Sequence, residues 1–284
     1  MKIENPRLIV GHTGITWTDD HAEDGVKCIA DLGYNNIEVF AWVLKTFKEQ
    51  GKADMFKKYD IPLISSYFSI DIVNPDIRDA EMKKLAEWGE IAASMGAQSA
   101  TFGGNPVDRR TFKFAEHSKY VADFVNEAAA VLESKGMLLN FHPHTGTPVE
   151  TAEEIVAFYE AVDTKLVGFA PDIGQIQKGG ADPMKFVKDY ISILRLVHFK
   201  DYCGTVDFDA DGKEIDTSGF ACYSPLGMGV VDLVGILKYL EESTFDGPLM
   251  VELDVGQNMP MTAEAAVKID KEFMAGLGYK FVNR

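Results

Sequence analysis

The chain repeats one pattern: an amphipathic stretch with apolar residues every three or four positions, then a glycine, then a short apolar run. Three clear copies are "IADLGYNNIEVF", "AASMGAQSATFGG" and "LESKGMLLNFHPH". Gly33, Gly96 and Gly136 each fit the left-handed position that ends a helix, where a side chain would be strained. The apolar runs are too brief for helices, so the pattern predicts helices that alternate with buried strands.

Eight apolar runs predict eight strands, and the stretches between them predict helices. The expected strands are Leu8–Gly14, Asn36–Phe40, Pro62–Phe68, Gln98–Gly103, Met137–His144, Leu166–Ile173, Leu194–Lys200 and Pro248–Leu253. The expected helices include Glu23–Leu32, Asp79–Met95, Lys113–Ser134, Ala152–Ala161, Pro183–Tyr190, Val231–Glu242 and Ala263–Leu277. Strands and helices in this alternation favour an α/β fold with a closed parallel sheet, the (β/α)8 TIM barrel.

An open doubly wound sheet is the alternative, since its content of strands and helices would be similar. No GxGxxG motif follows the first expected strand, where a dinucleotide-binding sheet usually carries its pyrophosphate turn. Single barrels commonly reach about 250 residues, so we expect one TIM-barrel domain over residues 1–284. The polar, glycine-bearing stretch at about 201–229 is too long for an ordinary connection and predicts a loop that covers a site.

Charge and composition limit the partners. Lys and Arg number 28 against 44 Asp and Glu, a formal net charge of −16, which leaves no cationic stripe for a nucleic acid. No apolar run reaches the ~18 residues of a membrane span, and the first residues lack the apolar core of a signal peptide. Cys28, Cys203 and Cys222 form no close pair and predict reduced thiols. We therefore expect a soluble, cytoplasmic protein that binds a small molecule.

Charged residues stand at the ends of several expected strands, where burial would be costly unless they are paired or coordinated. The carboxyl ends of barrel strands are also where barrel enzymes carry out their chemistry. These residues are Glu38, His142, His144, Asp172, His198, Lys200 and Glu252. Because side chains alternate along a strand, His142 and His144 share one face and can point to a common centre.

Four of these residues form a candidate metal site, namely His142, Asp172, His198 and Glu252. Two imidazoles and two carboxylates suit Mn²⁺, Co²⁺, Zn²⁺ or Fe²⁺. Each residue taken singly has an ordinary alternative: a histidine bonded to the backbone, a helix-capping aspartate or a salt-bridged glutamate. Four together at successive strand ends favour one divalent metal, with manganese expected first and magnesium among the alternatives.

Three segments carry a resemblance to a known family: "FHPHTGTPVETAEEI", "APDIGQIQKGGADPMKFVKDYISILRLVHFKD" and "SPLGMGVVDLVGILKYLEESTFDGPLMVELD". They resemble the xylose isomerase-like TIM barrels, which include sugar epimerases, inosose dehydratases and endonuclease-type members. The likeness covers most of the chain and is most specific from Asn140 to Asp254. It implies a divalent metal and a small sugar or cyclitol substrate. Related barrels often pair, so a homo-oligomer is left open.

The resemblance also implies a set of metal ligands. Members of the family hold the metal through a Glu, an Asp, a His and a second Glu on the last four strands, and Asp172, His198 and Glu252 match the last three. His142 stands where the epimerases carry a glutamate, and the "HPH" arrangement is similar to inosose dehydratase. Gln175 replaces the histidine of the family's DxxH motif, which puts a substrate hydrogen bond or an extra ligand in doubt.

Aromatic residues at or just beyond the early strand ends are candidates for the rest of a sugar pocket. The candidates are Trp17, Phe40, Tyr67 and Phe102. Aromatic residues at such positions are as often ordinary core. Glu38 could orient a hydroxyl group of the substrate or pair with a lysine.

Such a site supports removal of a proton next to a carbonyl, which a metal and a positioned base accelerate. With His142 in place of one glutamate, Glu252 is the expected base, and His144 or Lys200 the proton donor or electrostatic clamp. The first hypothesis is a metal-dependent sugar isomerase or epimerase. The second is a lyase that dehydrates a keto-inositol or keto-sugar, or cleaves a 3-keto glycoside. The third is a non-catalytic sugar-binding barrel.

Overall fold

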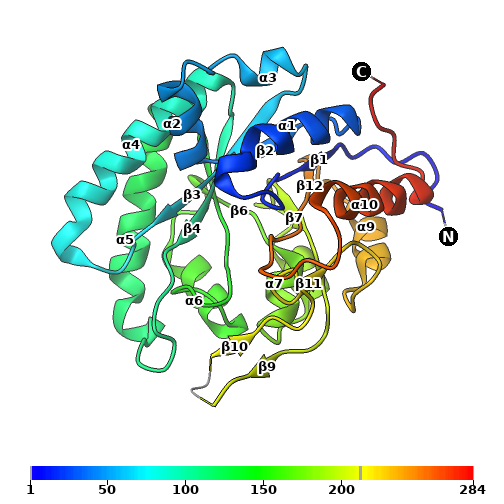
Figure 1. Cartoon of the computed structure of the whole chain (residues 1–284). Helices are drawn as coiled ribbons and strands as arrows, with labels where there is room; N and C mark the ends of the chain where they lie inside the picture. The colour runs from blue at the N-terminus through cyan, green and yellow to red at the C-terminus, as the bar shows by residue number, and fades with distance from the viewer. Residues whose placement is uncertain (1, 211–212, 284) are drawn as a thin grey trace.

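The computed structural model describes residues 2–210 and 213–283, and its central element is an eight-stranded parallel sheet (Figure 1). The strands are β1 (Val10–His12), β2 (Ile37–Phe40), β3 (Leu63–Ile70), β4 (Ser99–Gly104), β5 (Leu138–Phe141), β6 (Val167–Phe169), β7 (Val197–Phe199) and β12 (Leu249–Val251). They pair in the order β6-β5-β4-β3-β2-β1-β12-β7. Each expected strand overlaps one of these.

The sheet closes between β6 and β7 through two isolated parallel bridges. Phe169 pairs with Leu194, and Asp172 pairs with His198. The amide of His198 also donates to the carbonyl oxygen of Pro171 at 2.9 Å. The prediction of a (β/α)8 TIM barrel is confirmed, and two residues of the predicted metal site themselves join the edges of the sheet.

Several strands end earlier than expected, and the difference is largest for β5 and β6. The expected strand to His144 ends at Phe141, and the expected strand to Ile173 ends at Phe169. Pro143 and Pro171 follow these ends, and a proline has no amide hydrogen with which to continue a ladder. The polar side chains beyond β5 and β6 therefore project from the turns that leave the sheet.

Helices surround the sheet and follow the strands in chain order (Figure 1). They are α1 (Ala22–Asp31), α2 (Ala41–Glu49), α3 (Met55–Lys58), α4 (Arg78–Met95), α5 (Phe114–Glu133), α6 (Ala152–Ala161), α7 (Ile173–Lys178), α8 (Pro183–Asp189), α9 (Leu233–Glu242) and α10 (Ala263–Leu277), with short 3-10 turns at Asp19–His21 and Pro75–Ile77. Within the described ranges, no helix has both the length and the apolar character that crossing a membrane requires.

Helix starts follow from local sequence. Before α6, the hydroxyl of Thr151 accepts from the amide of Glu154 at 3.3 Å, and the Glu154 carboxylate accepts from the amide of Thr151 at 3.0 Å. This reciprocal pair satisfies two amides that the first turn leaves without partners. Before α8, Asp182 accepts from the amide of Met184 at 2.9 Å.

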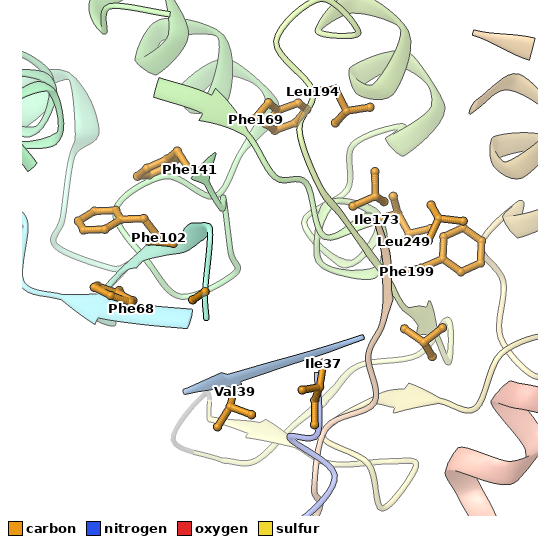
Figure 2. Close-up of a cluster of buried hydrophobic side chains, with 14 of the residues drawn as sticks. Ile37, Val39, Phe68, Phe102, Phe141, Phe169, Ile173, Leu194, Phe199 and Leu249 are labelled. Carbon is orange, nitrogen blue, oxygen red and sulfur yellow. The ribbon is translucent and has the colours of Figure 1, made fainter. Parts of the chain in front are cut away.

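Strand alternation divides the buried apolar side chains into two clusters. The main core lies between the sheet and the helices (Figure 2), where the labelled residues are Ile37, Val39, Phe68, Phe102, Phe141, Phe169, Ile173, Leu194, Phe199 and Leu249. Inside the barrel, Ala170, Leu196 and Met250 form a small separate cluster. The next inward positions after Leu196 and Met250 are His198 and Glu252, so the interior changes from apolar to charged toward the carboxyl ends.

The long segment between β7 and α9 folds into two antiparallel strand pairs. These are β8 (Asp201–Tyr202) with β11 (Tyr223–Ser224), and β9 (Asp207–Phe208) with β10 (Glu214–Ile215). The carboxylate of Asp201 accepts from the amides of Gly227, Gly229 and Val231 at 2.8 to 3.1 Å. These bonds fix the end of the segment to the start of β8, so the β9–β10 hairpin projects from a well-anchored base.

Gly33 is a position where alanine is expected to destabilise the protein. Its φ is +82°, and an added Cβ would lie 2.1 Å from the carbonyl oxygen of Val282. Gly136 provides a matched control, since its φ is +76° but nothing lies within 4 Å of an added Cβ. We expect Gly136→Ala to cost about 1 kcal/mol for its left-handed backbone and Gly33→Ala about 1–3 kcal/mol more for the displaced C-terminal segment. Urea unfolding measures both, and equal losses would contradict the close contact.

Candidate functional site

The charged residues predicted at the strand ends lie together inside the barrel. Six of them are at most 5% exposed: Glu38, His142, Asp172, His198, Lys200 and Glu252. Buried charges are costly unless an opposite charge or a metal compensates them. The short contacts among these side chains show how the protein compensates them.

His198 lies between two carboxylates. Its Nε2 is 2.8 Å from Oε1 of Glu38, and its Nδ1 is 2.7 Å from Oε2 of Glu252. Burial disfavours the charged imidazole, but Glu252 and Glu38 together raise the pKa of His198 well above its ordinary value. Burial also works against the charge of Glu252, yet His198 and Lys200 hold the pKa of its carboxyl well below the usual range.

Lys200 is the second buried cation. Its Nζ lies 3.0 Å from Oδ2 of Asp172, 2.5 Å from Oε1 of Glu252 and 2.6 Å from Oδ2 of Asp254. The same nitrogen is 4.4 Å from the centre of the Tyr223 ring. Burial opposes its charge, but the three carboxylates raise the pKa of Lys200 well above its ordinary value. The ammonium is therefore a fixed positive charge at the floor of the site.

A backbone contact sets the tautomer of His142. Its Nδ1 is 3.1 Å from the carbonyl oxygen of Ala170, which can only accept, so Nδ1 carries the hydrogen and Nε2 presents a lone pair. Burial lowers the pKa of His142 well below its ordinary value. A neutral imidazole with one nitrogen donating to a carbonyl is the usual arrangement of a metal-binding histidine.

Two overlapping groups of side chains could hold a metal ion. One consists of His142, Asp172 and His198, the other of Glu38, His198 and Glu252, and within each group the ligand atoms lie within 4.8 Å of one another. Asp172 uses Oδ1 to accept two amides of α7, at 2.9 and 3.0 Å, which leaves Oδ2 directed into the site. The structure thus brings the four predicted ligands together around His198 and adds Glu38 to them.

His144 and Gln175 contact each other beside these groups. Nδ1 of His144 donates to the carbonyl oxygen of Thr145 at 2.7 Å, and its Nε2 accepts from the side-chain Nε2 of Gln175 at 2.6 Å. The side-chain oxygen Oε1 of Gln175 accepts from the hydroxyl of Thr145 at 2.6 Å. Burial lowers the pKa of His144, which is consistent with this neutral form. Gln175 therefore orients the imidazole that the sequence suggested as a proton donor or electrostatic clamp.

A cavity of about 180 Å³, which we call the inner cavity, opens beside the charged residues. Its wall is formed by Ile15, Glu38, Phe40, Trp42, Tyr67, Ser69, His142, His144, Glu252 and Asp254. The Tyr67 ring stands edge-on to His142, with 5.5 Å between the ring centres, and Phe40 stacks on Trp42 at 4.2 Å. The inner cavity therefore joins aromatic walls to a charged floor, as a polyol ligand requires.

Two predicted pocket residues do not reach the inner cavity. Phe102 is fully buried in the outer core, 6.3 Å from Phe141 between ring centres (Figure 2). Its neighbour Thr101 points inward and donates to Oε2 of Glu38 at 2.5 Å, so alternation directs Phe102 away from the site. Trp17 packs on Gly25 of α1 and lines a separate small cavity.

Several residues of the inner cavity were not among the predicted site residues. Asp254 follows Glu252 by two positions, so the same alternation that selected His144 beside His142 also points to it. Trp42 lies in α2, a helix that was not among the expected elements, and Ser69 lies near the carboxyl end of β3 without charge or aromatic character. No sequence signal distinguishes these two residues.

Known proteins resemble the chain over nearly all of its length. The family model described as xylose isomerase-like TIM barrel matches residues 26–277. An inosose dehydratase from Clostridium perfringens is 26% identical, with 94% of this chain and 97% of the relative covered. Among solved structures, the IOLI protein with a bound zinc atom has a TM-score of 0.75 at 18% identity, with 98% and 100% of the two chains covered. A 3-keto-D-glucoside 4-epimerase from E. coli has a TM-score of 0.71 at 15% identity, with 95% and 98% covered. The chain belongs to the xylose isomerase-like TIM barrel family.

Proposed function

We propose that the chain is a metal-dependent lyase that removes water from a keto-polyol or keto-sugar. The observation that carries the proposal is the neutral imidazole of His142 in the wall of the inner cavity, where a two-carboxylate epimerase would need a base. The relatives named inosose dehydratase support the same choice. The sequence alone favoured an isomerase or epimerase first, and these two observations move the lyase ahead of it.

The side chains present fit a divalent cation. His142 offers a free Nε2, and Asp172, His198 and Glu252 complete a mixed nitrogen and oxygen set. These three residues now contact Lys200 or one another, and a bound cation would take the place of part of those contacts. When bound, such a cation would polarise the substrate carbonyl and stabilise negative charge on its oxygen. The zinc atom in the similar IOLI protein supports a divalent metal in general, and manganese is the first ion that we would test.

Dehydration next to a carbonyl requires a single base and not a pair of bases. In the proposal Glu252 removes the proton from the carbon beside the carbonyl, and the bond from the adjacent carbon to its hydroxyl group then breaks. The hydroxyl leaves as water with the proton that Glu252 took, so a carbon–carbon double bond forms and no net proton is released. Lys200 stabilises the charged carboxylate, while His144, held by Gln175, contacts the leaving side of the substrate.

Isomerase or epimerase activity is the second candidate, and Glu38 favours it. This residue places a second carboxylate in the wall of the inner cavity. Both of its oxygens are engaged, one by His198 and one by Thr101. Both oxygens of Glu252 are likewise engaged, by His198 and Lys200, so the ranking of this candidate below the lyase rests on His142 and on the inosose dehydratase relatives.

Metal removal combined with product analysis tests the function. We expect the manganese-loaded protein to convert a keto-inositol to a product lighter by one water, a chelator to abolish the reaction, and added metal to restore it. Mass spectrometry in deuterated buffer separates the hypotheses. Deuterium uptake without loss of water would favour the isomerase or epimerase, and ketose binding with neither change would favour a non-catalytic barrel.

A further inference from the structure

A second and larger cavity, which we call the outer cavity, adjoins the inner one. Its volume is about 820 Å³, and both cavities have His144 and Asp254 in their walls. We propose that the outer cavity binds a neutral ring attached to the reacting sugar or cyclitol, with Phe208 as the surface on which that ring stacks. The substrate would then be a glycoside and not a sugar phosphate. The inference rests on the proposed function only in placing the reacting ring in the inner cavity.

The two volumes suggest two parts of one ligand. The inner cavity, at about 180 Å³, is smaller than the ~300–1,000 Å³ typical of pockets that enclose drug-sized ligands, whereas the outer cavity lies within that range. Since His144 and Asp254 belong to both walls, a group attached to a ring beside Glu252 would extend directly into the outer cavity. A single free sugar would leave most of this space to water.

The charges around the outer cavity favour a neutral group over a phosphate, because three of its four basic side chains are paired with carboxylates. Four basic side chains line it, and so do four acidic ones: Arg109, Arg110, Lys178 and Lys213 against Asp108, Glu150, Glu214 and Asp254. Arg109 is 3.2 Å from Glu150, Arg110 is 2.9 Å from Asp108, and Lys178 is 2.6 Å from Glu214. A phosphate site needs cationic donors that are not already paired with carboxylates. A wall with balanced charge suits a neutral group.

Phe208 gives the outer cavity its aromatic surface. It lies on β9 directly opposite Glu214 of β10, and both residues line the outer cavity. Its side chain is 62% exposed, which is unusual for a phenylalanine in a folded hairpin. Sugar and phenyl rings bury apolar faces against such a ring, so a bound ring would remove this surface from water.

The same hairpin provides a matched control. Ile215 of β10 is 45% exposed but pairs with Asp207, so it lies on the opposite face of the hairpin, and it lines a different cavity. Phe208→Ala and Ile215→Ala each remove an exposed apolar side chain from the same element. Only Phe208→Ala removes an apolar side chain from the wall of the outer cavity.

Calorimetric titration of the metal-loaded protein tests the inference with probes that cannot react. The probes are phenyl β-glucopyranoside, methyl β-glucopyranoside and glucose 6-phosphate, none of which carries the ketone. We expect the phenyl glycoside to bind about 3- to 10-fold more tightly than the methyl glycoside, with glucose 6-phosphate the weakest. Phe208→Ala should remove the advantage of the phenyl ring, and Ile215→Ala should keep it.

Equal affinities for the phenyl and methyl glycosides, or tightest binding of glucose 6-phosphate, would overturn the inference. Because these probes undergo no elimination, their binding does not depend on whether the protein is a lyase. Conversely, dehydration of a free keto-inositol with no phenyl effect would preserve the proposed function and remove only the outer subsite. Circular dichroism of both variants excludes unfolding as the cause of a lost advantage.

Discussion

Replacement of Glu252 by glutamine is expected to lower the exchange of the substrate's α-proton with solvent deuterium by about 10²- to 10⁴-fold, the usual contribution of a general base. The carboxylate lines the inner cavity and is kept charged by His198 and Lys200, at 2.7 and 2.5 Å. A glutamine has nearly the same shape but cannot accept the proton. Nuclear magnetic resonance of a ketose in deuterated buffer, at saturating manganese, measures the loss.

Glu241→Gln is the matched control for this experiment. It removes the same charge from a side chain that contacts Arg7 and Tyr279, far from the barrel interior, and should leave exchange unchanged. Metal content must be measured for both variants because Glu252 is also a candidate ligand. Undiminished exchange in Glu252→Gln would remove this residue from the role of base. Exchange that is lost at low manganese but normal at saturating manganese would make it a ligand only.

Replacement of Lys200 by methionine is expected to produce the largest loss of stability, about 3–5 kcal/mol of unfolding free energy. Methionine keeps much of the apolar stem but removes the ammonium, which leaves Asp172, Glu252 and Asp254 facing one another at the floor of the site. His198 still offsets part of the charge of Glu252, but the three carboxylates lose the cation that they share, so the folded state becomes less favourable. Urea denaturation in the presence of a chelator measures the loss.

A divalent metal should restore part of that stability. A cation bound by Asp172 and Glu252 would replace the lost positive charge, and a ligand at one hundred times its dissociation constant stabilises a folded protein by about 2.7 kcal/mol. Lys119→Met is the control, since its partner Asp123 is on the surface, and should change stability by less than about 0.5 kcal/mol. A loss of unfolding free energy below about 1 kcal/mol in Lys200→Met would contradict the role of Lys200 as the cation that holds the three carboxylates together.

Periodicity was enough to predict the barrel, because each repeat carries its own signals. The left-handed glycines after helices, confirmed at Gly33, Gly96 and Gly136, mark where β2, β4 and β5 are about to begin. The position of the predicted metal site also follows from the local sequence. Two-residue steps along one strand, from Leu196 to His198, put a charged side chain directly above an apolar one on the same inward face.

Other features depended on contacts that a single sequence does not reveal. The α2 helix follows β2 without a capping side chain or a turn residue, so no local signal separates the two elements. Phe102 was expected at the pocket because it ends an apolar strand, but the face that it occupies is set by Thr101 and its bond to Glu38. The contact of Glu38 with His198 joins residues from strands far apart in the chain, which no periodicity can show.

The bridge between Asp172 and His198 limits how this protein can diverge. Selection for a new reaction could not shift either residue freely, because their backbones also join β6 to β7, the two edges of the sheet. The β9–β10 hairpin contributes no strand to the barrel, so its residues do not also join the edges of the sheet. Descendants of this gene would therefore acquire new specificities first through insertions and substitutions in that hairpin, while the reaction itself stays conserved.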